Sequence, residues 1–334
     1  MILASVVSVV GACVATYIVL RFLPRFGFVD VPNERSSHDT PTATLGGAGL
    51  MIGFLSGCFV YTITVGTPWD TWGLGAIVIV LAIFARDELR PMGRLAKLGV
   101  QTVAAVIAIH VMGPLQMVSL PGGVELDLGW MGPAITWFLY VAGQNLYNFM
   151  DGIDGLAGTE GVLAAAGFGV VMWMGGSSYA PMAVLLACAS LGFLIWNLPT
   201  ARVFMGDVGG HLLGLVLCTL AVVAQREGIP IWLSGAIMGT FVFDSVYTIL
   251  RRALKGENVT MAHRFHLYQR LVRMGWSHLA VVFVYGLHTI ALTTGAVLVV
   301  AGYFTHGYSL VGLGLLSFAI STVAIERRWS REAV

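Results

Sequence analysis

The chain is dominated by long apolar runs that are separated by short polar loops. About eleven of these runs approach the roughly 20 residues that a helix needs to cross the core of a bilayer, and they cover 2–23, 46–66, 71–86, 96–115, 131–147, 158–176, 180–197, 209–224, 230–250, 278–302 and 306–325. Because a bilayer core offers the backbone no hydrogen-bond partners, such runs fold as helices. Only 10% of the residues are charged, against about 25% in soluble domains. We therefore predict an all-α polytopic membrane protein that forms one domain over residues 1–334.

The connection between the fourth and fifth runs differs from the others. Its sequence, VSLPGGVELDLG, alternates apolar and polar residues around Pro121–Gly123, which is typical of a small β-hairpin. The four cysteines lie inside apolar runs and form no CxxC pair, so packing explains them better than metal or redox chemistry. Because no Lys or Arg precedes Arg21, we expect the first run to remain as a helix and not to be cleaved as a signal peptide.

Basic residues lie almost entirely on one side of the predicted membrane. The loops after odd-numbered runs and the C-terminal tail carry nearly all Lys and Arg, and Arg226 alone lies in a loop on the other side. The positive-inside rule assigns the basic side to the cytoplasm. We therefore predict that the N-terminus is outside, that the C-terminus is cytoplasmic and that the hairpin is periplasmic.

The polar sequence motifs gather on the same predicted side. Five cytoplasmic loops are rich in acids, amides and glycine: PNERSSHDTPTATLGG (32–47), RDELRPMGRLAK (86–97), NLYNFMDGIDGLAG (145–158), NLPTARVFMGDVGG (197–210) and RRALKGENVTMAHRFHLYQR (251–270). Acids beside a bilayer are costly and usually mark function. A site built from these loops could join a soluble substrate to a lipid one.

Asp151 and Asp154 lie three residues apart in a glycine-rich turn, and Asn145 and Asn148 precede them at the same spacing. Residues three apart share a helix face, so these amides and carboxylates could hold a nucleotide or a polar head group. The alternative is a polar helix end with an Asp as its cap, which would explain one acid but not the set.

Asp207 precedes the eighth run in the segment FMGDVGG. A lone Asp at this place is most often a helix cap, but the flanking glycines permit close approach of a ligand, and a carboxylate is a suitable ligand for Mg²⁺. Phe204 is either a packing residue or an aromatic ring that stacks on a base.

Two acids, Asp87 and Glu88, follow the third run. Adjacent residues do not share a helix face, so we expect one to point into the site and the other to support it. Lys97 begins the fourth run and is either a phosphate contact or a lysine that extends toward the membrane interface.

His263 and His266 flank Arg264 in the segment AHRFHLYQR. Without nearby Cys or acid ligands this spacing is poor for zinc, but it suits a cationic cradle for phosphate. The alternative is a basic amphipathic helix at the interface. Asp244 lies within the ninth run, and we expect it to pair with Arg251 two turns later.

Taken together, the loops resemble the polyprenyl-phosphate N-acetylhexosamine-1-phosphate transferases, glycosyltransferase family 4. NxxNFMDGIDGLAG and FMGDVG carry the resemblance, which extends over nearly the whole chain. The first loop is similar to the family's PNxRxxHxxPTPxxGG, with Ala43 in place of a proline, and Asp87-Glu88 stands where two Asp residues are usual. The last loop resembles the AHRxHxYQR form of the branch that initiates O antigen.

The resemblance implies transfer of N-acetylhexosamine 1-phosphate from a UDP-sugar to undecaprenyl phosphate, with release of UMP, as the start of a lipid-linked glycan such as O antigen. It implies Mg²⁺, or alternatively Mn²⁺, held by Asp207 and Asn148. The catalytic residues would be Asp87, Glu88 and Asp207. The substrate contacts would be Arg35, His38, Lys97, Asn145, Asn148, Asp151, Asp154, Phe204, His263, Arg264 and His266.

The same resemblance implies a multi-pass protein of the bacterial inner membrane whose active site faces the cytoplasm. Its expected partners are UDP-N-acetylhexosamine, undecaprenyl phosphate and the bilayer. No nucleic acid partner is expected, and a homodimer is left open.

Three alternatives to this function are weaker. An ion-coupled transporter would place acids in broken helices at mid-bilayer, whereas only Asp244 lies inside a run, and near its predicted cytoplasmic end. An intramembrane aspartyl protease would carry GxGD, but Phe204 stands at the first glycine. The third is the peptidoglycan phospho-N-acetylmuramoyl-pentapeptide transferase branch, from which AHRFHLYQR departs.

Overall fold

The part of the chain that the structure describes is a bundle of helices with two small strand pairs. The computed structural model describes residues 1–32, 40–66, 71–259 and 265–332. Its elements are α1 (Ile2–Phe22), η1 (Leu23–Phe26), β1 (Val29–Asp30), β2 (Thr42–Ala43), α2 (Gly46–Val65), α3 (Thr71–Leu89), α4 (Arg94–Met112), β3 (Met117–Leu120), β4 (Val124–Asp127), η2 (Gly129–Met131), α5 (Gly132–Phe149), α6 (Leu156–Met174), α7 (Ala180–Asn197), α8 (Gly206–Arg226), α9 (Ile231–Ile237), α10 (Gly239–Leu254), α11 (Leu267–Arg273), α12 (His278–Val300) and α13 (Phe304–Glu332).

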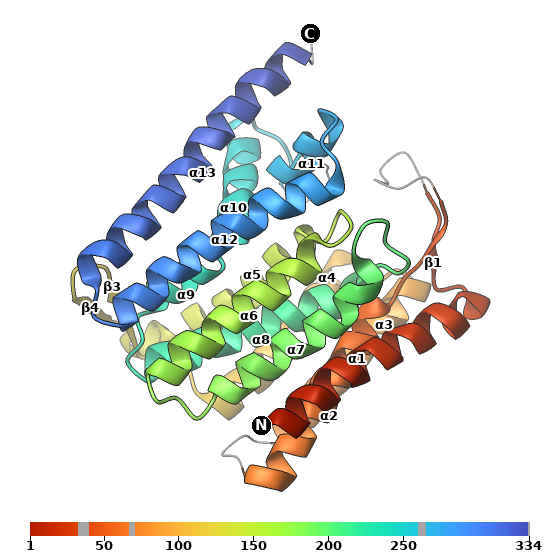
Figure 1. Cartoon of the computed structure of the whole chain (residues 1–334), viewed down its shortest axis with the longest axis horizontal. Helices are drawn as coiled ribbons and strands as arrows, with labels where there is room; N and C mark the ends of the chain where they lie inside the picture. Colours follow the sequence, from red (N-terminus) through yellow and green to blue (C-terminus); the bar gives the residue numbers. More distant parts are fainter. Residues whose placement is uncertain (33–39, 67–70, 260–264, 333–334) are drawn as a thin grey trace.

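Helix α8 is the centre of the bundle. Its most apolar 18-residue stretch is 94% buried, which none of the other membrane-length helices of the described chain approaches. Helices α2, α3, α4, α5 and α6 all contact it, while α12 and α13 pack together at one side and α1 packs on α2 and α7 at the other (Figure 1). The residues at the N-terminus of α8 are therefore surrounded by the ends of several helices.

Helices α1 and α2 approach each other closely because glycine faces α1. A Cβ atom added at Gly53 would lie only 2.4–2.6 Å from the atoms of Ala12. Close contact of small residues replaces the hydrophobic effect as a driving force between helices in lipid. This contact holds α1 and α2 together.

Eight helices of the described chain are long and apolar enough to cross a membrane, and a ninth span is obtained if α9 and α10 are counted together. The polytopic helical class is confirmed. The predicted runs 71–86 and 131–147 are helical, as α3 and α5, but are not among those eight. The count of eleven and the orientation therefore stay predictions.

The predicted run 230–250 is not one straight helix. It is split at Met238 into α9 and α10, which meet at an angle of 86°. The break follows Gly235 and precedes Gly239, and glycine weakens a helix. Sequence hydropathy shows the length of such a run but not its bend.

The predicted hairpin is confirmed. β3 and β4 pair antiparallel, with Val118 opposite Leu126 and Leu120 opposite Val124. A second pair was not predicted: β1 and β2 join Val29 to Ala43. Figure 1 shows β1 and α11 at one end of the bundle and the β3–β4 hairpin at the other.

The contact at Gly53 generates the first prediction. We expect Gly53→Ala to lower the melting temperature of the purified protein, because overpacking of a tight contact costs about 1–3 kcal/mol. The matched control is Gly99→Ala in α4, where an added Cβ would meet nothing within 4 Å. Equal melting temperatures of the two variants would contradict the close contact.

The two ends of the bundle generate a second prediction. Helix α4 has 19 residues, or about 28 Å of helix, and separates exposed Gly93 from the hairpin. In a chain whose native cysteines are replaced by alanine, we expect an impermeant thiol reagent to label Glu125→Cys in intact cells and Gly93→Cys only after lysis. Ready labelling at Gly93→Cys in intact cells would refute the predicted orientation.

Candidate active site

A cavity of about 550 Å³ opens at the N-terminal end of α8. All five motif loops contribute to its lining, and the fifth does so through Gln269 of α11, which closes one side. The lining residues are Val29, Asp30, Thr44, Asp87, Glu88, Pro91, Lys97, Asn148, Asp151, Gly152, Ile153, Asp154, Asn197, Phe204, Gly206, Asp207 and Gln269. Six of them are acids, and Lys97 is the one cation among the described lining residues.

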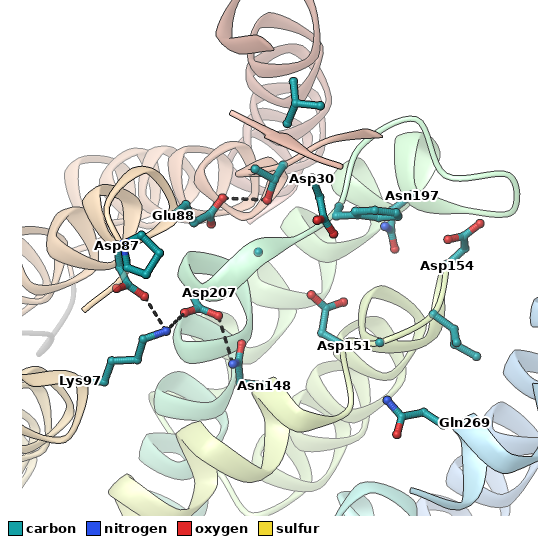
Figure 2. A pocket seen from close by; sticks show the side chains of 17 residues that line it. Asp30, Asp87, Glu88, Lys97, Asn148, Asp151, Asp154, Asn197, Asp207 and Gln269 are labelled. Carbon is teal, nitrogen blue, oxygen red and sulfur yellow. Dashed lines mark hydrogen bonds and ion pairs between the residues drawn. The ribbon is translucent and has the colours of Figure 1, made fainter. Parts of the chain in front are cut away.

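Lys97 lies between two carboxylates. Its Nζ atom is 2.5 Å from Oδ2 of Asp87 and 2.7 Å from Oδ2 of Asp207, and Asn148 donates its amide N–H to Oδ1 of Asp207 at 3.2 Å (Figure 2). The Asp87 side chain is only 3% exposed, whereas Asp207 keeps 24% exposed. Asp207 is therefore the more accessible carboxylate of the two.

Each of these side chains comes from the end of a different helix. Asp87 is in the last turn of α3, Lys97 in the first turn of α4, Asn148 in the last turn of α5 and Asp207 in the first turn of α8. A carboxylate at a helix N-terminus is stabilised by the helix dipole. The ends of these four helices thus meet at one point, although the four residues are far apart in sequence.

Glu88 joins this group to Thr44, the residue that follows strand β2. Its Oε2 atom accepts a hydrogen bond from the Thr44 hydroxyl at 2.7 Å. The main chain of Gly206 also approaches it: Gly206 has φ +70°, and a Cβ added there would lie 2.1 Å from Oε1 of Glu88. The structure therefore gives Glu88 a supporting contact. However, Glu88 lines the cavity as Asp87 does, so the expected division into one acid that points into the site and one that supports it is not found.

Asp151 and Asp154 occupy the other half of the cavity with different surroundings. Burial, together with the charges of Asp207 and Glu88, raises the pKa of Asp151 well above its usual value. Asp154 accepts a hydrogen bond from the backbone of Ala201 at 3.0 Å. Asp151 is thus the acid that would gain most from an added cation, while Asp154 also fixes a neighbouring loop.

The structure brings together many of the predicted site residues but not all of them. Asp87, Glu88, Lys97, Asn148, Asp151, Asp154, Phe204 and Asp207 line the cavity. Asn145 instead exchanges two hydrogen bonds with the amide of Gln101, at 2.9 and 3.0 Å. His266 is 3% exposed and lies beside Asp244, outside the lining. Arg35, His38, His263 and Arg264 lie outside the described residues.

The predicted pair of Asp244 with Arg251 is wrong. Arg251 forms an ion pair with Glu326 of α13, with Nε 2.6 Å from Oε1. Asp244 points instead to the beginning of α11 and accepts the backbone N–H of Leu267 at 2.8 Å. Arg251 and Asp244 each have a partner on another helix and do not pair with each other. The spacing of residues along α10 could not show this.

Four lining residues with polar side chains were not singled out from the sequence. Asp30 reaches the cavity through the pairing of β1 with β2. Asn197 bridges two motif loops, since its side chain accepts from Gly155 N at 3.0 Å and donates to Val203 O at 2.9 Å. Thr44 and Gln269 complete the set. Thr44, Asn197 and Gln269 lie inside the motif loops, and only Asp30 lies outside all five.

The donor set fits a hard divalent cation. The cavity offers carboxylate oxygens in excess over the one lysine among its described lining residues, and burial raises the pKa of two of those acids, Asp151 and Glu88. Within the described residues, no three His, Cys, Asp or Glu side chains lie close enough to form a complete metal cage. That is compatible with Mg²⁺, which is usually held by one or two carboxylates while substrate phosphates and water supply the other ligands.

Comparison with known proteins decides the family. Residues 71–225 match the sequence profile of glycosyl transferase family 4. The chain is 30% identical over 305 residues to the decaprenyl-phosphate N-acetylglucosaminephosphotransferase of Mycobacterium tuberculosis, covering 81% of this chain and 75% of that protein. The chain belongs to glycosyl transferase family 4.

Two further relatives of the family have related names. The chain is 29% identical to a probable undecaprenyl-phosphate N-acetylglucosaminyl 1-phosphate transferase of Bacillus subtilis, over 83% of this chain and 78% of that protein. It is 28% identical to the undecaprenyl-phosphate alpha-N-acetylglucosaminyl 1-phosphate transferase of Escherichia coli K12, over 91% and 85%. The resemblance of the motif loops to the superfamily is confirmed, as is the enzyme class of phosphoglycosyltransferase. The branch that the last loop resembles stays a prediction.

The position of Lys97 generates the third prediction. We expect Lys97→Met to lower kcat/KM of the transferase by about 100-fold or more, because it removes the cation shared by two carboxylates. Lys255→Met, an exposed lysine at the end of α10, is the control and should change kcat/KM little. Steady-state kinetics of the two folded variants decide, and equal activities would contradict the role of Lys97.

Proposed function

We propose that this family 4 enzyme transfers N-acetylhexosamine 1-phosphate from a UDP-sugar to undecaprenyl phosphate and releases UMP. The observation that carries this proposal is the cavity of six acids and one lysine at the N-terminus of the buried helix α8. The names of the relatives support a polyprenyl phosphate acceptor and N-acetylglucosamine 1-phosphate as the transferred group.

The charges of the cavity constrain how it could bind these substrates. A UDP-sugar and a lipid phosphate are both anions, and the carboxylates around them would repel both. A divalent cation is therefore required for binding, and we propose Mg²⁺ (or Mn²⁺) held by Asp207 with Asn148 beside it. When bound, this ion would neutralise the pyrophosphate and the charge that develops as the bond to UMP breaks.

The chain's own residues would divide the remaining work. Lys97 lies next to Asp207 and would contact a phosphate oxygen. Asp87 is engaged by Lys97 and by the backbone N–H of Met92, so its main role would be to orient that lysine. Asp151 would hold the nucleotide end with Asp154, and Phe204, which lines the same cavity, would stack on uracil.

The reaction needs little help from a general base. The second pKa of a phosphate monoester is about 6, so the lipid phosphate is largely dianionic at neutral pH. One of its oxygens attacks the β-phosphorus of the UDP-sugar, and the bond from that phosphorus to the bridging oxygen breaks. That oxygen leaves with UMP, and the lipid keeps the sugar through a new diphosphate. We therefore propose direct transfer without a phosphorylated enzyme.

The experiment is an assay of UMP release by the purified protein in nanodiscs. It contains undecaprenyl phosphate, Mg²⁺ and, in separate reactions, UDP-N-acetylglucosamine, a UDP-N-acetyl-6-deoxyhexosamine and UDP-N-acetylmuramoyl-pentapeptide. We expect UMP to appear with at least one of the first two and only when the lipid is present. No release with any of the three, or equal release without lipid, would overturn the proposal. Release with the pentapeptide substrate alone would assign the peptidoglycan branch instead.

The proposed role of Asp207 generates the fourth prediction. We expect Asp207→Asn to insert and fold but to lose nearly all activity, because an amide is a much weaker ligand for Mg²⁺ than a carboxylate. Rates are measured over a Mg²⁺ titration, with Asp127→Asn on the exposed strand β4 as the control. A near wild-type rate of Asp207→Asn at sub-saturating Mg²⁺ would show that Asp207 does not hold the ion.

A further inference from the structure

Asp244 is a completely buried carboxylate that collects hydrogen-bond donors from three elements. Its side chain is 0% exposed. It accepts the backbone N–H groups of Leu267 at 2.8 Å and Tyr268 at 3.2 Å in α11. It also accepts the hydroxyls of Tyr285 on α12 at 2.7 Å and of Thr248 on α10 at 3.2 Å, and Nδ1 of His266 lies at 3.3 Å. A buried carboxylate is stable only when its oxygens are bonded in this way.

The positions of these donors show that Asp244 holds the N-terminus of α11. Leu267 and Tyr268 are the first two residues of α11, and the first N–H groups of a helix have no partner within it. Helix α11 has only seven residues, too few to be stable without outside contacts. Asp244 on α10 and Tyr285 on α12 therefore fix where α11 begins.

Helix α11 in turn contacts the loop that carries Asp151. The hydroxyl of Tyr268 donates to the backbone oxygen of Phe149 at 2.9 Å, at the end of α5. A Cβ atom added at Gly152 would lie 2.1 Å from that hydroxyl oxygen. Tyr268 thus packs directly on the main chain on both sides of Asp151.

Gln269, the next residue of α11, reaches the cavity itself. Its Oε1 atom accepts the backbone N–H of His266 at 3.3 Å, which leaves its amide nitrogen on the side of Gly152 and the cavity (Figure 2). A shift of α11 would therefore move both the loop around Asp151 and one wall of the pocket.

We propose that Asp244 is a positioning residue for the pocket. It fixes the N-terminus of α11, and α11 places Tyr268 and Gln269 against the loop between α5 and α6. The inference rests on the proposed function only in that the pocket is taken to bind a UDP-sugar. Asp244 does not line the cavity and touches no reacting group.

Glu160 provides a matched control. It is also a buried carboxylate, 3% exposed, and its oxygens accept from the hydroxyls of Thr240 at 3.2 Å and Thr289 at 2.7 Å. These contacts join α6, α10 and α12 without involving α11 or a residue of the cavity lining. A variant at Glu160 thus disturbs the same bundle but not the proposed link.

The test is a double-mutant cycle between Asp244→Asn and Tyr268→Phe. We expect Asp244→Asn to raise KM for the UDP-sugar by about 10-fold, as loss of a buried hydrogen-bond partner allows, with kcat reduced less than the increase in KM. Both substitutions break the same connection, which runs from Asp244 through Tyr268 to the loop between α5 and α6. The KM of the double variant should therefore be little higher than that of Asp244→Asn alone. Glu160→Gln should leave KM for the UDP-sugar unchanged. Any change that it makes in kcat/KM should multiply with the change made by Tyr268→Phe.

Amide hydrogen exchange gives a second readout that needs no substrate. We expect Asp244→Asn, but not Glu160→Gln, to raise exchange in α11 and in residues 150–155. If wild-type protein releases no UMP, the proposed function fails while this exchange comparison still decides the role of Asp244. Multiplicative effects of Asp244→Asn and Tyr268→Phe, or unchanged exchange in residues 150–155, would overturn the proposal. If Asp244→Asn does not fold, Tyr285→Phe replaces it in the same cycle and the same comparison.

Discussion

The ion pairs of Lys97 with Asp87 and Asp207 are the interaction on which the site depends. Two carboxylates this close together repel each other unless a cation lies between them. The ammonium group supplies that cation and, by doing so, joins the ends of α3, α4 and α8. The remaining contacts, such as those of Asn148 and Glu88, add further segments to the same junction.

The junction leaves the cavity with more negative than positive charge among its described residues. Such a cavity is a poor receptor for anions alone and a good one for anions that arrive with a metal ion. The raised pKa of Asp151 has the same origin, because its charged form is disfavoured by burial and by its acidic neighbours. Bound cations remove that penalty, so substrate and metal binding would assist each other.

Much of this arrangement could be predicted from the sequence, because it depends on local patterns. Hydropathy located the helices, alternation located the β3–β4 hairpin, and the acid and glycine motifs located Asp151 and Asp207 at helix ends. What could not be predicted depends on pairs that are distant in sequence. Asp30 lines the cavity only because β1 pairs with β2. Asp244 accepts a hydrogen bond from Tyr285, which lies 41 residues further along the chain. A single sequence shows donors and acceptors but does not show which of them meet.

We propose that the site at this acidic junction transfers a sugar phosphate and not a bare sugar. The most direct measurement follows the phosphorus atom next to the sugar, using UDP-N-acetylglucosamine labelled with ³²P in the β position, or the preferred UDP-sugar labelled in the same way. With undecaprenyl phosphate and Mg²⁺, we expect the label to move entirely into the lipid diphosphate and the released UMP to carry none. Label recovered in free UDP would contradict the claim, since it would show that the bond between sugar and phosphate had been broken instead.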